Sequence, residues 1–188
     1  LRAILRQDPD VVMVGEMRDV ETAQIGIQAS LTGHLVLSTV HTNSAVAAIT
    51  RLRDMGIESF LLASSLRTII SQRLVRRLCL SCKKEELPSK NSTKLFNLDT
   101  NKKVFTSSGC DDCSNTGYQG RIAIAECIQV DKTLKEMIHN NASENSISEH
   151  VFKNNQSIDE ASSELISKGI TSCEELIRIN NLQENASI

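Results

Sequence analysis

The 188-residue sequence contains no tryptophan, a single tyrosine and no lysine before Lys83. No apolar run approaches the length of a membrane-spanning helix, and no signal peptide is recognisable. A net charge of −2 offers no general argument for nucleic-acid binding. The missing lysines have the sharpest consequence, because a phosphate-binding loop of the G-x-x-x-x-G-K-[ST] type needs one. Such a loop is therefore excluded from the first 82 residues.

Basic residues change in type along the chain. Before residue 79 there are nine arginines and no lysine, whereas ten lysines and two arginines follow. Forked guanidinium groups suit fixed contacts to carboxylates or phosphates, although chance and arginine-tolerant helices explain the bias as well. The length suits one or two small domains. Because the sequence starts without methionine inside a helical pattern, we expect a piece of a longer protein.

Two short apolar segments, residues 11–14 and 35–40, are predicted strands. Each is followed by a helical pattern, for which Asp19 and Ser44 are the expected N-caps. This order of strand, helix, strand and helix predicts a parallel βαβ unit, and the wholly apolar strands are expected to be buried. A further helix is predicted over residues 59–77.

The character of the sequence changes at Cys79. A polar, weakly periodic stretch at residues 83–108 lies between two cysteine pairs, and a strand is predicted at residues 122–130. Short helices follow at residues 131–140, 144–153, 157–168 and 172–180. The predicted organisation is an α/β part, a cysteine module, a strand-and-helix region and a disordered tail, at residues 1–78, 79–121, 122–180 and 181–188.

Four of the six cysteines form two C-x-x-C pairs, Cys79 with Cys82 and Cys110 with Cys113. Each pair can place two thiolates on one tetrahedral ion, which makes structural zinc the favoured interpretation. Disulfides would need an oxidising compartment, a redox C-x-x-C would not occur twice, and an iron–sulfur cluster stays possible. Four thiolates leave no open position for catalysis by the metal. Cys127 and Cys173 are expected to be small buried apolar residues.

Glu16 follows a predicted strand and a glycine. A carboxylate at such a strand end can orient an attacking water or act through bound Mg²⁺, although a surface glutamate is the commoner case. His34 and His41 flank the second predicted strand, and their odd spacing places them on opposite faces of a regular strand. A structural histidine is the usual case beside an apolar strand. His41, in a polar loop, is the better candidate to contact a phosphate or the catalytic water.

Two segments carry a resemblance to a known family. Residues 8–19 (DPDVVMVGEMRD) resemble the Walker B region of the secretion-superfamily ATPases, and residues 32–43 (TGHLVLSTVHTN) resemble their His box. The cysteine segment, which closes in GYQGR at residues 117–121, resembles the zinc-binding module of the extension ATPases. The resemblance runs from residue 1 to about residue 179, and residues 21–34 are nearest the E component of type II secretion.

The resemblance implies a fold and a set of site residues. The fold is α/β: a partial RecA-like P-loop NTPase domain, made of a parallel sheet with helices, with an inserted tetracysteine zinc-binding module and a helical C-terminal region. Glu16 becomes the Walker B glutamate, and His34 and His41 become the His-box pair. The arginines near the nucleotide or the subunit interface are Arg2, Arg6, Arg18 and Arg121. The implied zinc ligands are Cys79, Cys82, Cys110 and Cys113.

The resemblance also implies cofactors, partners and a location. The cofactors are ATP with Mg²⁺, for the longer parent protein, and Zn²⁺. The partners are further copies of the chain in a homo-hexamer, the cytoplasmic domain of the type II secretion L component, and the inner-membrane F component. Nucleic acid is not among them. The location is the cytoplasm, on the cytoplasmic face of the bacterial inner membrane.

The predicted function is an ATP-hydrolysing motor of type II protein secretion, which powers assembly of a pseudopilus and export across the outer membrane. Without the phosphate-binding loop, this chain alone is predicted not to hydrolyse ATP. The alternatives are a type IV pilus extension ATPase and a zinc-stabilised module that only binds partners. Nucleic-acid binding by the zinc knuckles is disfavoured by acidic Asp111 and Asp112 and by the single nearby aromatic, Tyr118. The family's usual Asp-Gly is missing near residues 157–161.

Overall fold

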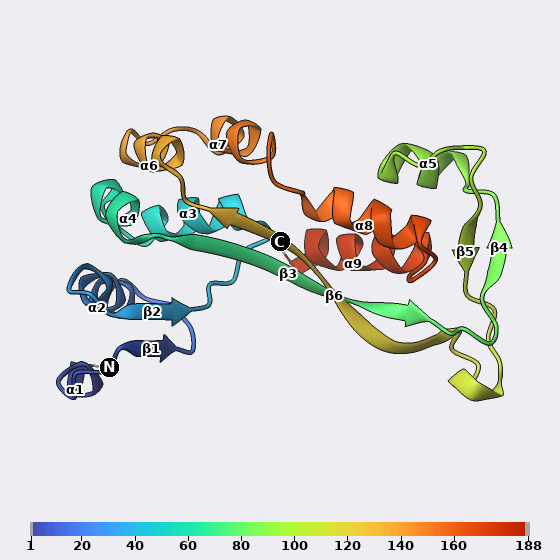
Figure 1. The fold of residues 1–188 in the computed structure, drawn as a ribbon, viewed down its shortest axis with the longest axis horizontal. Coiled ribbons are helices and arrows are strands. Elements are labelled where there is room, and N and C mark those ends of the chain that lie inside the picture. Colours follow the sequence, from blue (N-terminus) through green and yellow to red (C-terminus); the bar gives the residue numbers. More distant parts are fainter. Residues whose placement is uncertain (1, 187–188) are drawn as a thin grey trace. The chain divides into compact units, whose positions relative to one another are not determined.

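The computed structural model describes the backbone of residues 2–186 and the side chains of residues 3–179 (Figure 1). The chain divides into two compact units. Two long paired strands, β3 (Thr68–Leu78) and β6 (Tyr118–Gln129), contribute residues to both units. Within the described part, no helix has both the length and the apolar character that crossing a membrane requires. The first unit contains Leu1–Ser71 and Cys127–Asn155, and the second contains Gln72–Glu126 and Gln156–Ile188.

The first unit begins with the parallel βαβ arrangement that the sequence predicts. β1 (Val11–Val14) pairs in parallel with β2 (Leu35–Ser38), and α2 (Val20–Leu31) connects them. The expected N-cap of α2 is confirmed, because Asp19 Oδ1 accepts a hydrogen bond from the Thr22 amide at 2.8 Å. Ser44 caps α3 (Ala45–Asp54) in the same way, through the Ala47 amide at 3.0 Å.

Four more helices complete the first unit: α1 (Arg2–Leu5), α4 (Ser59–Ser65), α6 (Lys132–His139) and α7 (Glu144–Val151). The last two confirm the helices predicted at residues 131–140 and 144–153. The core of this unit is a cluster of buried aliphatic side chains from helices and from the end of β6, among them Ile27, Ile49, Leu62, Ile128 and Ile138.

The prediction that β1 and β2 are buried is wrong for one face of their sheet. Val12 and Val14 are buried, whereas Val11 and Met13 are 54% and 73% exposed. Opposite them on β2, Leu35 and Leu37 are 52% and 47% exposed. Because side chains alternate between the two faces of a strand, one apolar face of this pair of strands is uncovered.

The helix predicted over residues 59–77 is confirmed only for residues 59–65 and is wrong beyond them. The helix α4 ends at Ser65, the backbone of Leu66 is extended, and β3 begins at Thr68. Along β3, side chains at odd positions from residue 69 to residue 75 are more buried than those between them. A β-branched start followed by this period of two suits a strand that pairs with β6.

The second unit holds the cysteine pairs and the C-terminal helices. β4 (Lys84–Glu86) and β5 (Val104–Thr106) pair antiparallel, and α5 (Lys90–Phe96) lies between them in the sequence. The short 3-10 helix η1 (Asp111–Cys113) follows the hairpin. The unit ends with α8 (Ile158–Ser167) and α9 (Cys173–Ala186), which confirm the helices predicted at residues 157–168 and 172–180.

The core of the second unit draws on the polar stretch between the cysteine pairs. Phe96 and Val104 from that stretch are buried with Ile124, Ile166 and Leu176. A capping box formed by Ser157 and Glu160 starts α8, where the family's Asp-Gly is missing. The helix α9 continues to Ala186, past the start of the tail predicted at residues 181–188, and residues 187–188 lie outside the described part.

Candidate functional site

The loops that follow β1 and β2 are tied together at the carboxyl ends of these strands. The hydroxyl of Thr39 donates to the carbonyl of Gly15 at 2.6 Å, and the amide of Met17 donates to the carbonyl of Thr39 at 3.0 Å. These bonds continue the pairing beyond the strands and fix the backbone on both sides of Glu16. Polar side chains at this end of a parallel sheet are where open α/β folds place their ligands.

Glu16 is contacted at both of its carboxylate oxygens. His41 Nε2 lies 3.1 Å from Oε1, and Arg18 Nε donates to Oε2 at 2.5 Å. The side chain of Glu16 is 19% exposed, whereas those of Arg18 and His41 are 76% and 84% exposed. A fixed carboxylate thus meets an accessible guanidinium and an accessible imidazole, which are groups suited to orienting water and contacting phosphate.

The second predicted histidine lies elsewhere. His34 Nδ1 is 3.0 Å from the carbonyl of Ala29 and 3.2 Å from the hydroxyl of Thr32, so its ring sits over the C-terminal turn of α2. Gly33, with φ +106°, allows the chain to leave the helix there. The contacts described for His34 are those of a helix-ending structural residue, while His41 contacts Glu16.

The structure does not bring the predicted arginines together at one site. Arg18 joins Glu16, and Arg6 is an exposed residue just after α1. The side chain of Arg2 lies outside the described residues. Arg121 belongs to β6 in the second unit, where it lines a pocket with Arg76 and Arg178. The roles of these arginines, of Glu16 and of the two histidines stay predictions.

The four paired cysteines converge on one point of the second unit. Their sulfur atoms all lie within 4.8 Å of one another, and three of the separations are 3.9, 3.8 and 3.8 Å. Zinc–sulfur bonds of about 2.3 Å in a tetrahedron place sulfurs about 3.8 Å apart, whereas a disulfide needs about 2.0 Å. Thiolates around a multi-iron cluster lie farther apart, because the cluster fills the space between them. The donor set therefore fits a single zinc ion.

The turns around Cys113 leave no room for side chains at two glycines. Gly109 and Gly117 have φ of +93° and +75°, and a Cβ atom would meet the Asn115 carbonyl oxygen at 2.9 Å or the Ser107 Cβ at 2.5 Å. The amides of Cys110 and Gly117 donate to Cys113 Sγ at 3.3 and 3.2 Å. Burial opposes the ionisation of both thiols. It raises the pKa of Cys110 to about 12, whereas the two amides lower the pKa of Cys113 to about 6.

Comparison with known proteins decides the family. A family model described as "Type II/IV secretion system protein" matches residues 1–178. The chain belongs to this family. The resemblance to the type II secretion ATPases stated from the sequence is thereby confirmed. The structure itself confirms an α/β fold that carries a cysteine cluster.

Individual relatives of the chain support the same family. The chain is 53% identical over 183 residues to the "Type II secretion system ATPase E" of Vibrio cholerae serotype O1. It is 49% identical over 181 residues to the "Type II secretion system protein E" of Pseudomonas aeruginosa. Each match covers 95% of this chain and 36% of the relative, so the chain spans about a third of the relatives' length.

Two solved structures share the fold. The pilus retraction motor PilT with bound ADP matches with a TM-score of 0.64 at 27% identity, over 93% of this chain and 40% of that one. The Legionella pneumophila ATPase DotB matches with a TM-score of 0.65 at 21% identity, over 96% of this chain and 41% of that one. The second likeness concerns the fold alone.

The two remaining cysteines of this secretion-system protein differ from each other. Cys173 is buried, as predicted, but Cys127 is exposed on β6, and the prediction that it is buried is wrong. Cys127 lies between two buried residues, Glu126 and Ile128, so the alternation of the strand turns its side chain outward. Neither cysteine belongs to the cluster of four.

Sequence reasoning missed a buried carboxylate. Glu175 on α9 is fully buried, and its oxygens accept bonds of 2.6–2.9 Å from the guanidinium groups of Arg76 and Arg178. Burial raises the pKa of Glu175, but the bonds from Arg178 and Arg76 outweigh it and lower the pKa to about 2. A glutamate in the first turn of a helix carries no local signal of such burial.

We expect Glu175→Gln to destabilise the protein by about 2 kcal/mol, because it removes charge-assisted hydrogen bonds to a buried carboxylate. The loss is not larger because Arg76 and Arg178, 40% and 47% exposed, can still be solvated. Since folding lowers the pKa of Glu175 from 4.5 to about 2, its contribution is present above pH 4.5 and is lost as the pH falls toward 2. Denaturant unfolding of both proteins between pH 7 and pH 2 measures the difference. If the difference in the free energy of unfolding between the two proteins stays constant over this pH range, the pKa assigned to Glu175 is contradicted.

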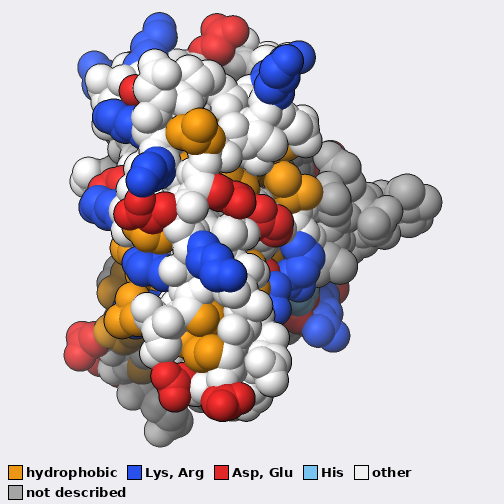
Figure 2. Space-filling model, turned by 90° about the vertical axis from the view of Figure 1, so that its right-hand side faces the viewer, with side chains coloured by type: hydrophobic (Ala, Val, Ile, Leu, Met, Phe, Trp, Pro, Cys, Tyr) orange, Lys and Arg blue, Asp and Glu red, His pale blue; other side chains and the backbone are white. Residues whose placement is uncertain are grey.

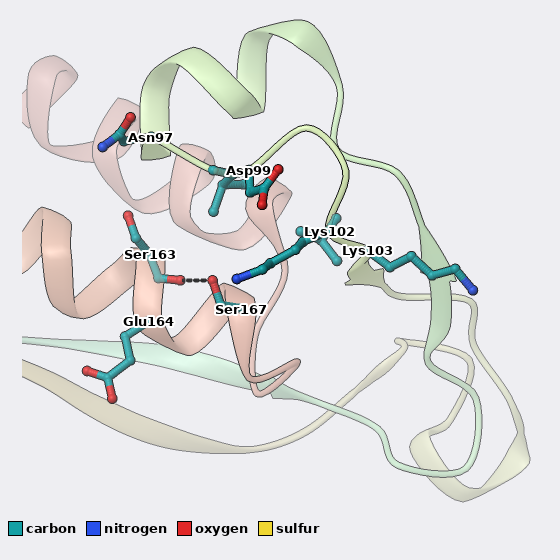
Figure 3. A pocket seen from close by; sticks show the side chains of 9 residues that line it. Asn97, Asp99, Lys102, Lys103, Ser163, Glu164 and Ser167 are labelled. Atoms are coloured by element: carbon teal, nitrogen blue, oxygen red, sulfur yellow. Dashed lines mark hydrogen bonds between the residues drawn. The ribbon is translucent and has the colours of Figure 1, made fainter.

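A second pocket, of about 480 Å³, lies beside α8 (Figure 3). Lys102 reaches into it toward Ser163 and Ser167, whereas Lys103 points away and pairs with Glu85 at 2.8 Å. Asp99 and Glu164 also line it, and the carboxylate of Glu164 pairs with Lys168. Charges of both signs are also intermixed over the side of the molecule on which β4, β5 and α5 lie (Figure 2). We assign no chemistry to this pocket.

Proposed function

We propose that the full-length protein containing this chain is the ATP-hydrolysing motor of type II protein secretion, which powers pseudopilus assembly and export across the outer membrane. The observation that carries the proposal is Glu16, held by Arg18 and His41 at the carboxyl end of a parallel strand. Membership in the family and a 53% identical relative named "Type II secretion system ATPase E" support it. The relatives named for type II secretion favour that system over the type IV pilus.

In this proposal Glu16 positions the water that attacks the terminal phosphate, and His41 holds the carboxylate in place through its other oxygen. The guanidinium of Arg18 uses Nε for Glu16 and is 76% exposed, so its outer edge is accessible to phosphate oxygens. Bound Mg²⁺ supplies charge neutralisation at the phosphates, and a carboxylate such as Glu16 suits that hard cation.

The first unit supplies one part of a RecA-like domain in this proposal. The open apolar face made by Val11, Met13, Leu35 and Leu37 supports it, because exposed aliphatic clusters on a sheet are usually covered by further structure. The 188 residues correspond to about a third of the relatives' length, which leaves ample chain for that cover. The phosphate-binding loop absent from these residues belongs to that same remainder.

The proposal includes assembly and location. Further copies of the protein form a homo-hexamer, and the cytoplasmic domain of the L component and the inner-membrane F component hold it at the cytoplasmic face of the inner membrane. In the second unit the four paired cysteines hold one structural Zn²⁺, supported by sulfur separations that fit a tetrahedral ion.

The function is tested by comparing the 188-residue chain with the full-length protein in a phosphate-release assay with Mg²⁺ and ATP. We expect the full-length protein to hydrolyse ATP and the 188-residue chain to show no Glu16-dependent release, because it has no loop to hold the phosphates. Hydrolysis by the short chain that Glu16→Gln abolishes would contradict this division. No hydrolysis by the full-length hexamer would contradict the motor.

A further inference from the structure

Three arginines line one open pocket of about 500 Å³ in the second unit. Arg76 comes from β3, Arg121 from β6 and Arg178 from α9. The one carboxylate in the lining is the buried Glu175. Three guanidinium groups therefore face a single negative charge, and the pocket carries an excess of two positive charges.

Two of these arginines are held in place before any ligand binds. The carboxylate of Glu175 receives Nε and Nη2 from both Arg76 and Arg178. The guanidinium of Arg76 also stacks 4.1 Å from the ring centre of Tyr118, whose hydroxyl lies 2.7 Å from the hydroxyl of Ser172. Fixed guanidinium groups lose little conformational entropy when they bind an anion.

The same arginines keep donors that are available to a ligand. Among the residues whose side chains are described, Nη1 of Arg76 and of Arg178 has no hydrogen-bond partner, and these two side chains are 40% and 47% exposed. Arg121 is exposed and has no hydrogen bond or ion pair to any residue that the structure describes. Donors from three separate elements are thus available around one hollow.

We propose that this pocket binds the phosphate group of a small soluble molecule, at a site separate from the one at Glu16, so that Arg121 serves this pocket rather than the nucleotide or subunit interface. A phosphate monoester carries about two negative charges near pH 7, which matches the excess charge of the pocket. Its three terminal oxygens offer one acceptor to each guanidinium. A pocket of about 500 Å³ is larger than a phosphate alone, and Leu74, 52% exposed, adds an apolar wall for the rest of the molecule.

The test is equilibrium dialysis of phenyl phosphate against the full-length protein, with excess ADP and Mg²⁺ present to fill the motor site. We expect one phenyl phosphate per chain, and Arg121→Gln should weaken its binding about 10-fold or more. Arg77→Gln is the matched control. It removes the same charge from β3, but Arg77 is exposed and is not part of the pocket. Binding to Arg77→Gln should stay within a factor of two of the unmodified protein.

Four outcomes overturn the proposal: no uptake of phenyl phosphate, unchanged uptake by Arg121→Gln, an equal loss in the two variants, which would report net charge alone, or displacement of the probe by acetate. Acetate at the same concentration should not displace the probe, and displacement would assign the pocket to carboxylates. Since Arg121 is exposed and makes no hydrogen bond or ion pair to a described residue, its variant should keep its fold, which the zinc content checks. Hydrolysis is not measured, so this test can fail while the motor function stands.

Discussion

The full-length protein carrying Cys113→Ser is expected to lose its zinc and to unfold its second unit. The thiolate of Cys113 is buried, accepts two backbone hydrogen bonds and lies 3.8 Å from the sulfurs of Cys82 and Cys110. Structural zinc contributes about 10–16 kcal/mol of binding free energy in zinc-finger peptides, against about 5–15 kcal/mol for the stability of a typical domain. The binding free energy lost with one ligand is therefore expected to exceed the stability of the second unit.

We expect metal loss to destabilise the C-terminal helices α8 and α9 as well. The turn between α8 and α9 is held by the segments that carry the ligands, through three contacts. The amide of Leu78 donates to the carbonyl of Ile170 at 2.8 Å. Lys83 Nζ donates to the carbonyl of Gly169 at 3.0 Å. The hydroxyls of Tyr118 and Ser172 lie 2.7 Å apart. We expect protease cleavage within residues 156–180 to accompany metal loss.

Metal analysis and limited proteolysis of the same preparation measure both effects. The matched control is Cys127→Ser, because Cys127 is exposed and outside the cluster. We expect about one zinc per chain in the control, the stoichiometry of a four-thiolate site. A Cys113→Ser protein that keeps its zinc, or that loses zinc and resists protease as well as the control, would refute a structural metal.

Glu16→Gln in the full-length protein is expected to lower the rate of ATP hydrolysis by about 10²–10⁴-fold, the range that a positioned acid–base group contributes. Glutamine keeps the size of the side chain but loses the charge that orients water and pairs with Arg18 and His41. ATP binding should remain, because Glu16 is proposed to position water rather than to hold the phosphates. A steady-state assay and a binding titration separate the two quantities.

Glu58→Gln is the matched control for this change. Glu58 is an exposed residue of the same unit, at the N-cap of α4, where its side chain makes no capping hydrogen bond. It should leave the hydrolysis rate within a factor of two of the unmodified protein. An equal fall in both variants would point to general damage rather than to a role for Glu16.

Local features of the fold were predictable because local chemistry decides them. The N-caps Asp19 and Ser44 are confirmed since a short acceptor side chain before an amphipathic run satisfies a free helix amide. The parallel pairing of β1 and β2 followed from the order of strand and helix. The cysteine cluster was predictable because two C-x-x-C pairs can meet on one ion whatever lies between them.

Features that depend on distant partners were not predictable in the same way. The helix predicted over residues 59–77 fails because half of it pairs with β6, which lies about fifty residues later in the chain. The burial of Glu175 was not predictable because, although Arg178 follows it at i+3 on the same helix, its other partner, Arg76, comes from β3, about a hundred residues earlier in the chain. Glu16 and His41 were both candidates, yet their contact depends on Thr39 joining the two loops.

The measurement that tests the central claim most directly is the nucleotide recovered from the full-length protein carrying Glu16→Gln after one round of incubation with ATP and Mg²⁺. If Glu16 performs the chemistry at the end of β1, bound nucleotide should be recovered as ATP, while the unmodified protein and Glu58→Gln return ADP. Recovery of ADP from Glu16→Gln at the rate of the unmodified protein would contradict the account.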